Sequence, residues 1–188
     1  MSMKGDFPEA IGAPGESASA ICTYSGAYVD VFNPDPATIH LTDIAHALAV
    51  IPRFNGHTRE HYTIAEHSIA VAELVPWEDG LWGLMHDASE AYMCDIPRPI
   101  KYHPSFKAVY EEIETALMAA VCDRFDLDHT MPESVVHADE QALSTERAHL
   151  MHPVTERWEI TKKPRSHLFK HNDPERAFLS AYYAYARS

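Results

Sequence analysis

Residues 63–76 read TIAEHSIAVAELVP and hold the clearest helix signals of the chain. Thr63 and Glu66 have the spacing of a capping box, in which each side chain bonds to a free backbone N–H at the helix start. The residues that follow recur at steps of three and four, which is the period of one helix face, and Pro76 cannot continue a helix. The pattern predicts a helix that starts after Thr63, ends at Pro76 and carries on one face Ile64, His67, Val71 and Leu74.

Helices separated by prolines are also expected along the rest of the chain after residue 38. We predict them at 42–51 with Thr42 as N-cap, at 78–93, after Pro104, at 132–150, and after Asn172 as the cap of the last one. The helix after Pro104 is expected to bury a stripe formed by Val109, Ile113, Ala116, Leu117, Ala120 and Val121. The predicted fold class is therefore all-α.

Two segments do not show a helical pattern. Residues 1–38 carry Gly and Pro and predict an irregular arm, with a short hairpin between Thr23 and Val31 around Ser25-Gly26. Residues 152–171 predict a long ordered loop, and such loops are often functional. We therefore expect an arm at 1–38 and one helical domain at 39–188.

Composition narrows the range of partners. The formal net charge of −13 disfavours a nucleic-acid polymer, because phosphate backbones need a basic face. No run of 18 apolar residues is present, so we expect no membrane span, and the N-terminus does not resemble a signal peptide. The three cysteines form no C-x-x-C pair, which fits a reducing cytoplasm and disfavours a thiolate zinc site.

Four residues on three predicted helices are candidate metal ligands: His67, His86, Asp87 and Asp139. Adjacent helical residues point about 100° apart, so His86 and Asp87 would reach a metal from its two sides. Two imidazoles and two carboxylates suit a borderline divalent transition metal better than calcium. A histidine bonded to an aspartate can also be purely structural, and each residue alone is a weak signal.

The joint pattern resembles the HD-domain phosphohydrolase superfamily, in which the order H…HD…D appears here as His67, His86-Asp87 and Asp139. Further likeness to the YfbR-like 5′-deoxynucleotidase branch, and equally to phage-type dATP triphosphohydrolases, lies in Arg53-Phe54, Glu66-His67-Ser68, residues 86–90 and residues 95–101. The resemblance covers about residues 40–150. It implies a helical HD-domain bundle that holds one divalent ion (Co, Mn, Zn, Fe or Ni) and hydrolyses a small nucleotide.

Glu90 and Asp95 are the candidate catalytic residues. Glu90 follows His86 by four positions and Asp87 by three, on the same side of the predicted helix, where it could move a proton to or from water or the leaving oxygen. A solvated helix glutamate is the structural alternative. By resemblance, Asp95 would accept a hydrogen bond from a sugar 3′-hydroxyl; it could instead cap the turn before Pro97.

Arg53, Phe54, Asp95 and Lys101 are the candidate substrate-binding residues. Arg53 could hold phosphate oxygens with its planar guanidinium. Phe54 stands where the nucleotidase branch usually carries a Trp that packs against the sugar, and Lys101 could steady a β- or γ-phosphate. The structural alternatives are a core aromatic for Phe54 and exposed cations for Arg53 and Lys101.

Hydrolysis of (deoxy)nucleoside 5′-monophosphates is the leading hypothesis. The alternatives are a deoxynucleoside triphosphohydrolase, for which a second ion, Mg²⁺, would be expected, and a catalytically silent nucleotide-binding module. The resemblance also implies a homo-oligomer, a dimer or larger.

Overall fold

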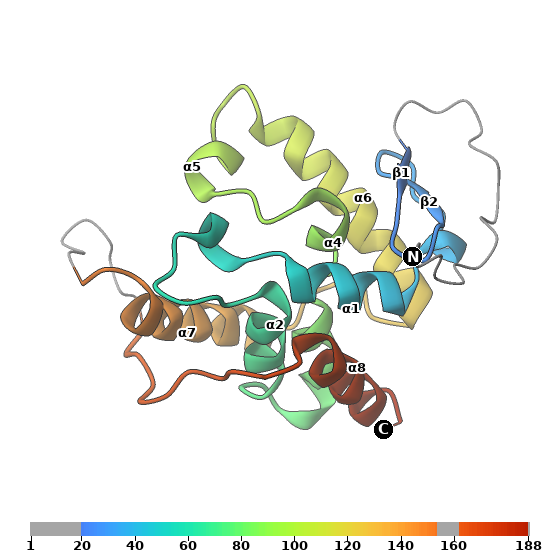
Figure 1. Cartoon of the computed structure of the whole chain (residues 1–188). Coiled ribbons are helices and arrows are strands. Elements are labelled where there is room, and N and C mark those ends of the chain that lie inside the picture. Colours follow the sequence, from blue (N-terminus) through green and yellow to red (C-terminus); the bar gives the residue numbers. More distant parts are fainter. Residues whose placement is uncertain (1–19, 154–161, 188) are drawn as a thin grey trace, which may run out of the picture.

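The computed structural model describes residues 20–153 and 162–187 (Figure 1). Residues 1–19 of the expected arm and 154–161 of the expected loop lie outside the described residues. Strands β1 (Ala20–Cys22) and β2 (Tyr28–Asp30) form an antiparallel hairpin, and Gly26 takes a positive φ of 86° in its turn. The hairpin is thus confirmed around Ser25-Gly26, although its first strand begins earlier than predicted.

The rest of the described chain is mostly helical, which confirms the predicted class. The α-helices are α1 (Leu41–Val50), α2 (Ile64–Ala72), α3 (Gly80–Met85), α4 (Glu90–Met93), α5 (Arg98–Lys101), α6 (Lys107–Phe125), α7 (Glu133–Leu150) and α8 (Pro174–Tyr185). Short 3-10 turns lie at η1 (Pro36–Thr38), η2 (Arg53–Gly56) and η3 (Trp77–Asp79).

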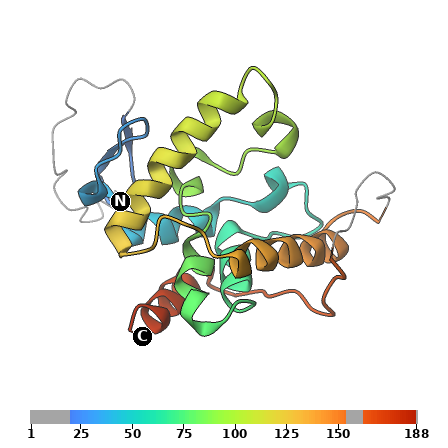
Figure 2. The same ribbon diagram turned by 180° about the vertical axis from the view of Figure 1, so that it is seen from behind.

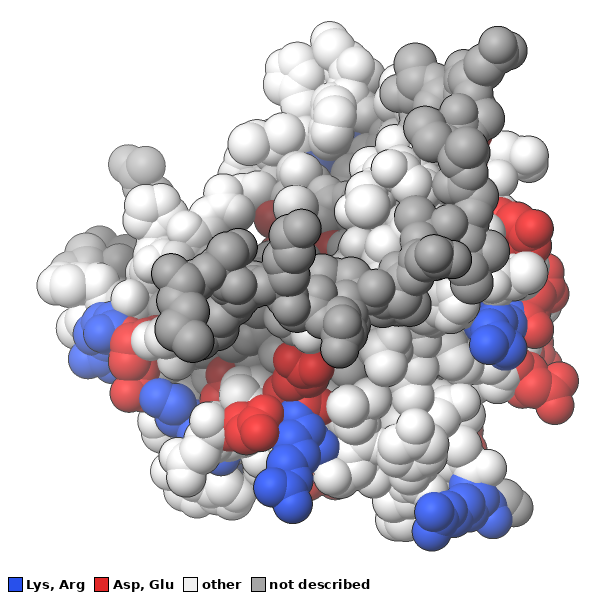
Figure 3. Space-filling view, turned by 45° about the vertical axis from the view of Figure 1, so that its right-hand side comes forward, with Lys and Arg blue, Asp and Glu red and all other residues white. Residues whose placement is uncertain are grey.

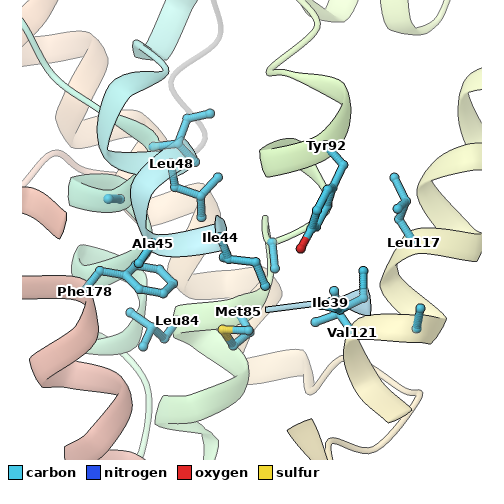
Figure 4. Packing of buried hydrophobic residues seen from close by; sticks show 14 of the residues in the cluster. Ile39, Ile44, Ala45, Leu48, Leu84, Met85, Tyr92, Leu117, Val121 and Phe178 are labelled. Carbon is cyan, nitrogen blue, oxygen red and sulfur yellow. The ribbon is translucent and has the colours of Figure 1, made fainter. Parts of the chain in front are cut away.

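Helix α2 lies at the centre of the helical body and contacts α1, α3, α7 and α8. Both ribbon views place α7 on one side of α2 and α8 on the other (Figures 1 and 2). The main core lies between α1, α3, α4, α6 and α8, where the side chains drawn in Figure 4 interdigitate. Every α2 residue is buried, including the polar Glu66, His67 and Ser68. This burial fixes His67 inside the protein.

One helix end and two N-caps differ from the predictions. The capping box at Thr63 and Glu66 is confirmed, with both reciprocal bonds present, but α2 ends at Ala72, before Pro76. Thr42 was wrong as an N-cap, because the extended backbone of His40 already starts α1 and its carbonyl accepts the first helical N–H bonds. Asp173, and not Asn172, caps α8 through a bond from the Arg176 N–H.

The predicted helix 78–93 is broken into α3 and α4 by a turn at residues 86–89. The Nδ1 atom of His86 lies 2.7 Å from the carbonyl oxygen of Gly83, so this side chain competes for a carbonyl that a continuing helix would use. The backbone instead tightens into three-residue bonds, as from Ala88 N–H to the Met85 carbonyl. The break places His86 and Asp87 in a turn rather than in the middle of a helix.

The predicted apolar stripe of α6 is only partly buried. Leu117, Ala120 and Val121 are buried, whereas Val109 is 47% exposed, because the first turns of α6 extend past the core.

In the part of the chain that the structure describes, no helix combines the length and apolarity needed to cross a membrane. On the face drawn in Figure 3, Lys and Arg side chains are scattered, several of them beside Asp and Glu side chains, and they form no continuous basic patch.

Gly83 marks the closest approach of α3 to α2, and we expect Gly83→Ala to destabilise the protein. An added Cβ would lie 2.9 Å from the Ala72 Cα atom, which is backbone and cannot rotate away. Overpacking costs about 1–3 kcal/mol, against a gain of about 1 kcal/mol from replacing a helical glycine. Urea denaturation should therefore show a net loss. At Gly80 the three atoms nearest to an added Cβ belong to the ring of Tyr185, which donates to the Ala72 carbonyl and packs against Trp77, so Gly80→Ala is a second case of overpacking, against a side chain. A more stable Gly83→Ala protein would contradict the close approach.

Candidate metal centre

Three chain segments bring the four predicted ligands together. His67 comes from α2, His86 and Asp87 from the turn after α3, and Asp139 from α7. His67, His86 and Asp87 offer ligand atoms that all lie within 4.8 Å of one another, a group that could hold a metal ion. Asp139 adjoins this group, with its Oδ1 atom 3.2 Å from the Nε2 atom of His67.

Hydrogen bonding fixes which ring nitrogen each histidine presents. A carbonyl oxygen can only accept, so the bond to Gly83 requires a proton on Nδ1 of His86 and leaves Nε2 as the lone-pair atom of the neutral ring. His67 has its Nδ1 atom 2.6 Å from the Glu146 carboxylate, which also only accepts. The two Nε2 atoms face each other at 3.2 Å. Two lone pairs would repel at this separation if both rings were neutral, so the arrangement suits a proton or a metal cation placed between them.

Asp87 supplies an oxygen to the same point. Its Oδ2 atom lies 3.3 Å from Nε2 of His86 and 3.5 Å from Nε2 of His67. Burial raises the pKa of Asp87, but the charges of His86, His67 and Arg53 outweigh burial and hold that pKa below its usual range. The pKa of Asp139 is likewise lowered to about 2, since hydrogen bonding to His67 and the charge of His67 outweigh burial. Both carboxylates are therefore ionised and able to bind a metal at neutral pH.

Metal binding should release a proton from His67. Burial lowers the pKa of this ring, but the acceptors Glu146 and Asp139 outweigh it and raise the pKa to about 10. Below that pH the metal-free protein holds an imidazolium, and a metal must displace its Nε2 proton. A rise in pH lowers the concentration of the protons that compete with the metal for Nε2. The Co²⁺ affinity should therefore increase about tenfold per pH unit between about pH 6 and 9.

Calorimetric titration of Co²⁺ in buffers of different ionisation enthalpy measures this proton release. His129→Gln is the control variant, because His129 is exposed and pairs with Asp123. This variant should release the same number of protons as the unaltered protein. A Co²⁺ affinity that does not depend on pH over this range would contradict the prediction.

Arg53 lies beside the metal centre and is almost fully buried. Its Nε and Nη2 atoms approach Oε2 of Glu146 at 3.3 and 3.2 Å. Its Nη1 atom faces Asp95 at 3.6 Å and Asp87 at 3.8 Å. One edge of the guanidinium is therefore held by Glu146, and the Nη1 side faces the carboxylates of the site.

Glu146 is a site residue that was not predicted. It is fully buried, contacts both His67 and Arg53, and has a lowered pKa because those two positive charges outweigh burial. A signal was present in the sequence, because Glu146 follows Asp139 by seven residues. Seven residues are two helical turns, which places both side chains on one face of α7.

Glu90 is buried at the start of α4, and its Oε2 atom has no hydrogen-bond partner among the described residues. Its pKa is raised well above the usual range by burial and by the charges of Asp87 and Asp95. Glu90 thus keeps its proton at a pH where an exposed glutamate is ionised. A buried, protonated carboxyl beside a metal site is chemically equipped to donate a proton.

Two segments that carry candidate substrate residues have strained backbone. Phe54 and Asn55 both take φ of 53°, and Cys94, directly before Asp95, takes φ of 67° with ψ of 161°. Such conformations cost about 1–3 kcal/mol each in non-glycine residues and often occur at functional sites. The Phe54 ring lies 5.5 Å from the Arg53 guanidinium carbon, so both candidate residues adjoin one another.

Lys101 is placed differently from the other predicted site residues. Its Nζ atom lies 2.8 Å from Oε1 of Glu114 and 4.5 Å from the centre of the Tyr110 ring. Burial lowers the pKa of Lys101, but the contacts with Glu114 and Tyr110 outweigh burial and raise that pKa above its usual value, so Lys101 remains charged. Within the described residues, no hydrogen bond or ion pair joins Lys101 to His67, Asp87 or Arg53.

Comparison with known proteins gives a relative that matches most of both chains. The uncharacterized protein YfdR of Escherichia coli strain K12 is 40% identical over 135 residues, which cover 70% of this chain and 72% of YfdR. The chain belongs to the YfdR family. A further relative in Rhodobacter capsulatus, the uncharacterized protein RCAP_rcc00048, is 37% identical over 123 residues, 61% of this chain and 62% of that protein.

A more distant relative of this YfdR family member is named for an enzymatic activity. The 5′-deoxynucleotidase PBPRA2627 of Photobacterium profundum is 30% identical over 108 residues, which span 54% of this chain and 47% of the relative. The chain therefore matches about half the length of that enzyme and less than two thirds of the Rhodobacter protein. No protein-family model matches the chain.

Proposed function

We propose that this chain is a metal-dependent phosphohydrolase of the HD-domain superfamily, formed by residues 39–188, that acts on (deoxy)nucleoside 5′-monophosphates. The observation that carries the proposal is the convergence of two imidazole Nε2 atoms and two carboxylates beside the buried side chains of Glu90 and Arg53. The distant likeness to a 5′-deoxynucleotidase supports the choice of substrate.

His67, His86, Asp87 and Asp139 would hold the ion, and their nitrogen and oxygen donors suit Co, Mn, Zn, Fe or Ni. Such an ion, when bound, lowers the pKa of a water ligand and polarises phosphoryl oxygens. Arg53 would bind a phosphate oxygen through Nη1. Water would attack phosphorus as the bond from phosphorus to the 5′-oxygen breaks, and Glu90 would give its proton to that leaving oxygen. The newly formed phosphate keeps one proton of the water, and the other would return to the Glu90 carboxylate.

Phe54 and Asp95 would recognise the sugar. Asp95 is only partly exposed and faces Arg53 at 3.6 Å, so a nucleotide phosphate on Arg53 would bring its sugar close to Asp95. A carboxylate there can accept a hydrogen bond from the 3′-hydroxyl, and the Phe54 ring offers an apolar surface next to Arg53. The 3′-hydroxyl is common to ribose and deoxyribose, so a preference for deoxyribose would come from Phe54 packing against C2′.

The second candidate is a deoxynucleoside triphosphohydrolase, which would need a further ion such as Mg²⁺. Its support is the electrostatic proximity of three arginines. Burial and the positive charges of Arg98 and Arg53 lower the pKa of Arg147, next to Glu146 on α7. Repulsion among these groups would be relieved by a polyanion such as a triphosphate.

A product-resolved assay tests the proposal. Metal-loaded protein is incubated with the common nucleoside mono- and triphosphates in ribo and deoxy forms, each with Co²⁺, Mn²⁺ or Zn²⁺, and released phosphate and polyphosphate are measured separately. Phosphate from monophosphates supports the proposal, and tripolyphosphate or pyrophosphate supports the second candidate. Nucleotide binding without any turnover would identify a silent binding module and refute the proposed activity. Light scattering on the same sample tests the proposed homo-oligomer.

A further inference from the structure

One buried carboxylate, that of Glu146, joins the two halves of the proposed site. Its Oε1 atom lies 2.6 Å from Nδ1 of His67, and its Oε2 atom lies 3.2 and 3.3 Å from Nη2 and Nε of Arg53. Glu146 is 0% exposed, and within the described residues its hydrogen bonds and ion pairs go to His67 and Arg53 rather than to His86 or Asp87. It acts on the site only through the two residues that it holds.

We propose that Glu146 is a positioning residue that sets the metal affinity through His67 and the substrate affinity through Arg53. On the metal side, an acceptor at Nδ1 keeps the proton on that atom and leaves the Nε2 lone pair directed at the ion. It also makes the ring a stronger donor, and the loss of such an outer partner typically weakens metal binding about 10–100-fold.

On the substrate side, Glu146 keeps Arg53 from neutralising a metal ligand. The Nη1 atom of Arg53 is 3.8 Å from Oδ2 of Asp87. With Glu146 in place, two nitrogens of the guanidinium are directed away from Asp87 and only Nη1 faces it. Without this restraint, the buried cation would have Asp87 and Asp95 as its remaining ionic partners, and it would compete with both the metal and a phosphate.

Glu146→Gln tests the metal side with Co²⁺ alone. An amide oxygen can accept from His67, but an amide NH₂ would then face the Arg53 nitrogens, and all of these groups are donors. A neutral amide is also a weaker acceptor for His67 than a carboxylate. We therefore expect the Co²⁺ dissociation constant, measured calorimetrically on folded metal-free protein and corrected for the protons released on binding, to rise about 10–100-fold.

Asp43→Asn is the matched control. Asp43 is a second buried carboxylate, and it accepts bonds from Thr23 and Ser25 in the hairpin, far from the ligands in the chain. Its loss should lower the thermal midpoint and leave the Co²⁺ dissociation constant unchanged. A folded Glu146→Gln protein that binds Co²⁺ as tightly as this control would overturn the proposal.

A measurement on the unaltered chain covers the case in which Glu146→Gln does not fold. In Zn²⁺-loaded protein labelled with ¹⁵N-histidine, long-range ¹H–¹⁵N spectra report which ring nitrogen carries the proton. His67, assigned by its absence in His67→Gln, should show a protonated Nδ1 and a metal-bound Nε2. The opposite assignment would overturn the proposal without any variant of Glu146.

The substrate side rests on the proposed function. If the chain hydrolyses nucleotides, Glu146→Gln should raise KM as well as weaken Co²⁺ binding, and the double variant Arg53→Ala/Glu146→Gln should have a KM no higher than Arg53→Ala alone. Additive effects on KM would refute the coupling through Arg53. If no nucleotide is hydrolysed, the proposed function is refuted. The Co²⁺ affinity and the ¹⁵N spectra would still test the positioning role of Glu146 toward His67.

Discussion

Glu90→Gln should lower kcat by about two to four powers of ten, the range typical for loss of a general acid. Glutamine has nearly the same shape as a protonated glutamic acid, but it cannot give a proton to the leaving 5′-oxygen. Because Glu90 lies beside the ligands and is not expected to bind the ion itself, the metal content should be unchanged. Steady-state phosphate release and elemental analysis of the same sample measure both quantities.

Glu112→Gln is the control for this prediction, since Glu112 is an exposed glutamate on α6. It should leave kcat and metal content as they are. The raised pKa of Glu90 adds a second test, because an acid must be protonated to act. The fall of kcat on the alkaline side should therefore be lost in Glu90→Gln, and a Glu90→Gln enzyme with undiminished kcat would exclude Glu90 as the acid.

His86→Ala should remove the metal and, with it, all turnover. The substitution deletes the Nε2 ligand and also the Nδ1 bond to the Gly83 carbonyl that shapes the turn at residues 86–89. Loss of a direct ligand should weaken Co²⁺ binding by more than the roughly 10–100-fold expected for an outer partner. Inductively coupled plasma analysis after dialysis, and calorimetric titration with Co²⁺, measure the effect.

His129→Ala serves as the matched histidine variant, since His129 pairs with Asp123 on the surface and should retain one ion per chain. Circular dichroism on both variants separates loss of metal from loss of fold. Retention of a full complement of metal by folded His86→Ala would contradict the ligand set.

The sequence predicted which side chains converge better than it predicted the local structure that brings them together. His67, His86, Asp87 and Asp139 converge in the structure, and the helix at Thr63 begins where the capping box places it. Such a start is local, because both bonds of the box join residues three apart. The family resemblance supplied the link between distant segments that no local pattern contains.

The helix break and the role of Glu146 were not predicted. Each depends on a side-chain hydrogen bond, in one case to a backbone carbonyl and in the other to residues distant in the sequence. Helical periodicity carries no information on the bond from His86 to the Gly83 carbonyl, which breaks the helix at 78–93. In the sequence Glu146 looks like an ordinary helix residue, because its partners His67 and Arg53 are distant along the chain and only the fold brings them into contact. Lys101, predicted to steady a β- or γ-phosphate, pairs with Glu114 in the structure, and its contact with phosphate stays a prediction.

The order of the site residues along the chain has a consequence for synthesis on the ribosome. His67 is translated 79 residues before its carboxylate partner Glu146. At about 5–20 residues per second, this interval lasts roughly 4–16 s. During this time α2 can cap its own start but has no acceptor for a histidine destined for the interior. The cluster around His67 is therefore incomplete until α7 emerges, and the proposed ion could meet all four candidate ligands only after that point.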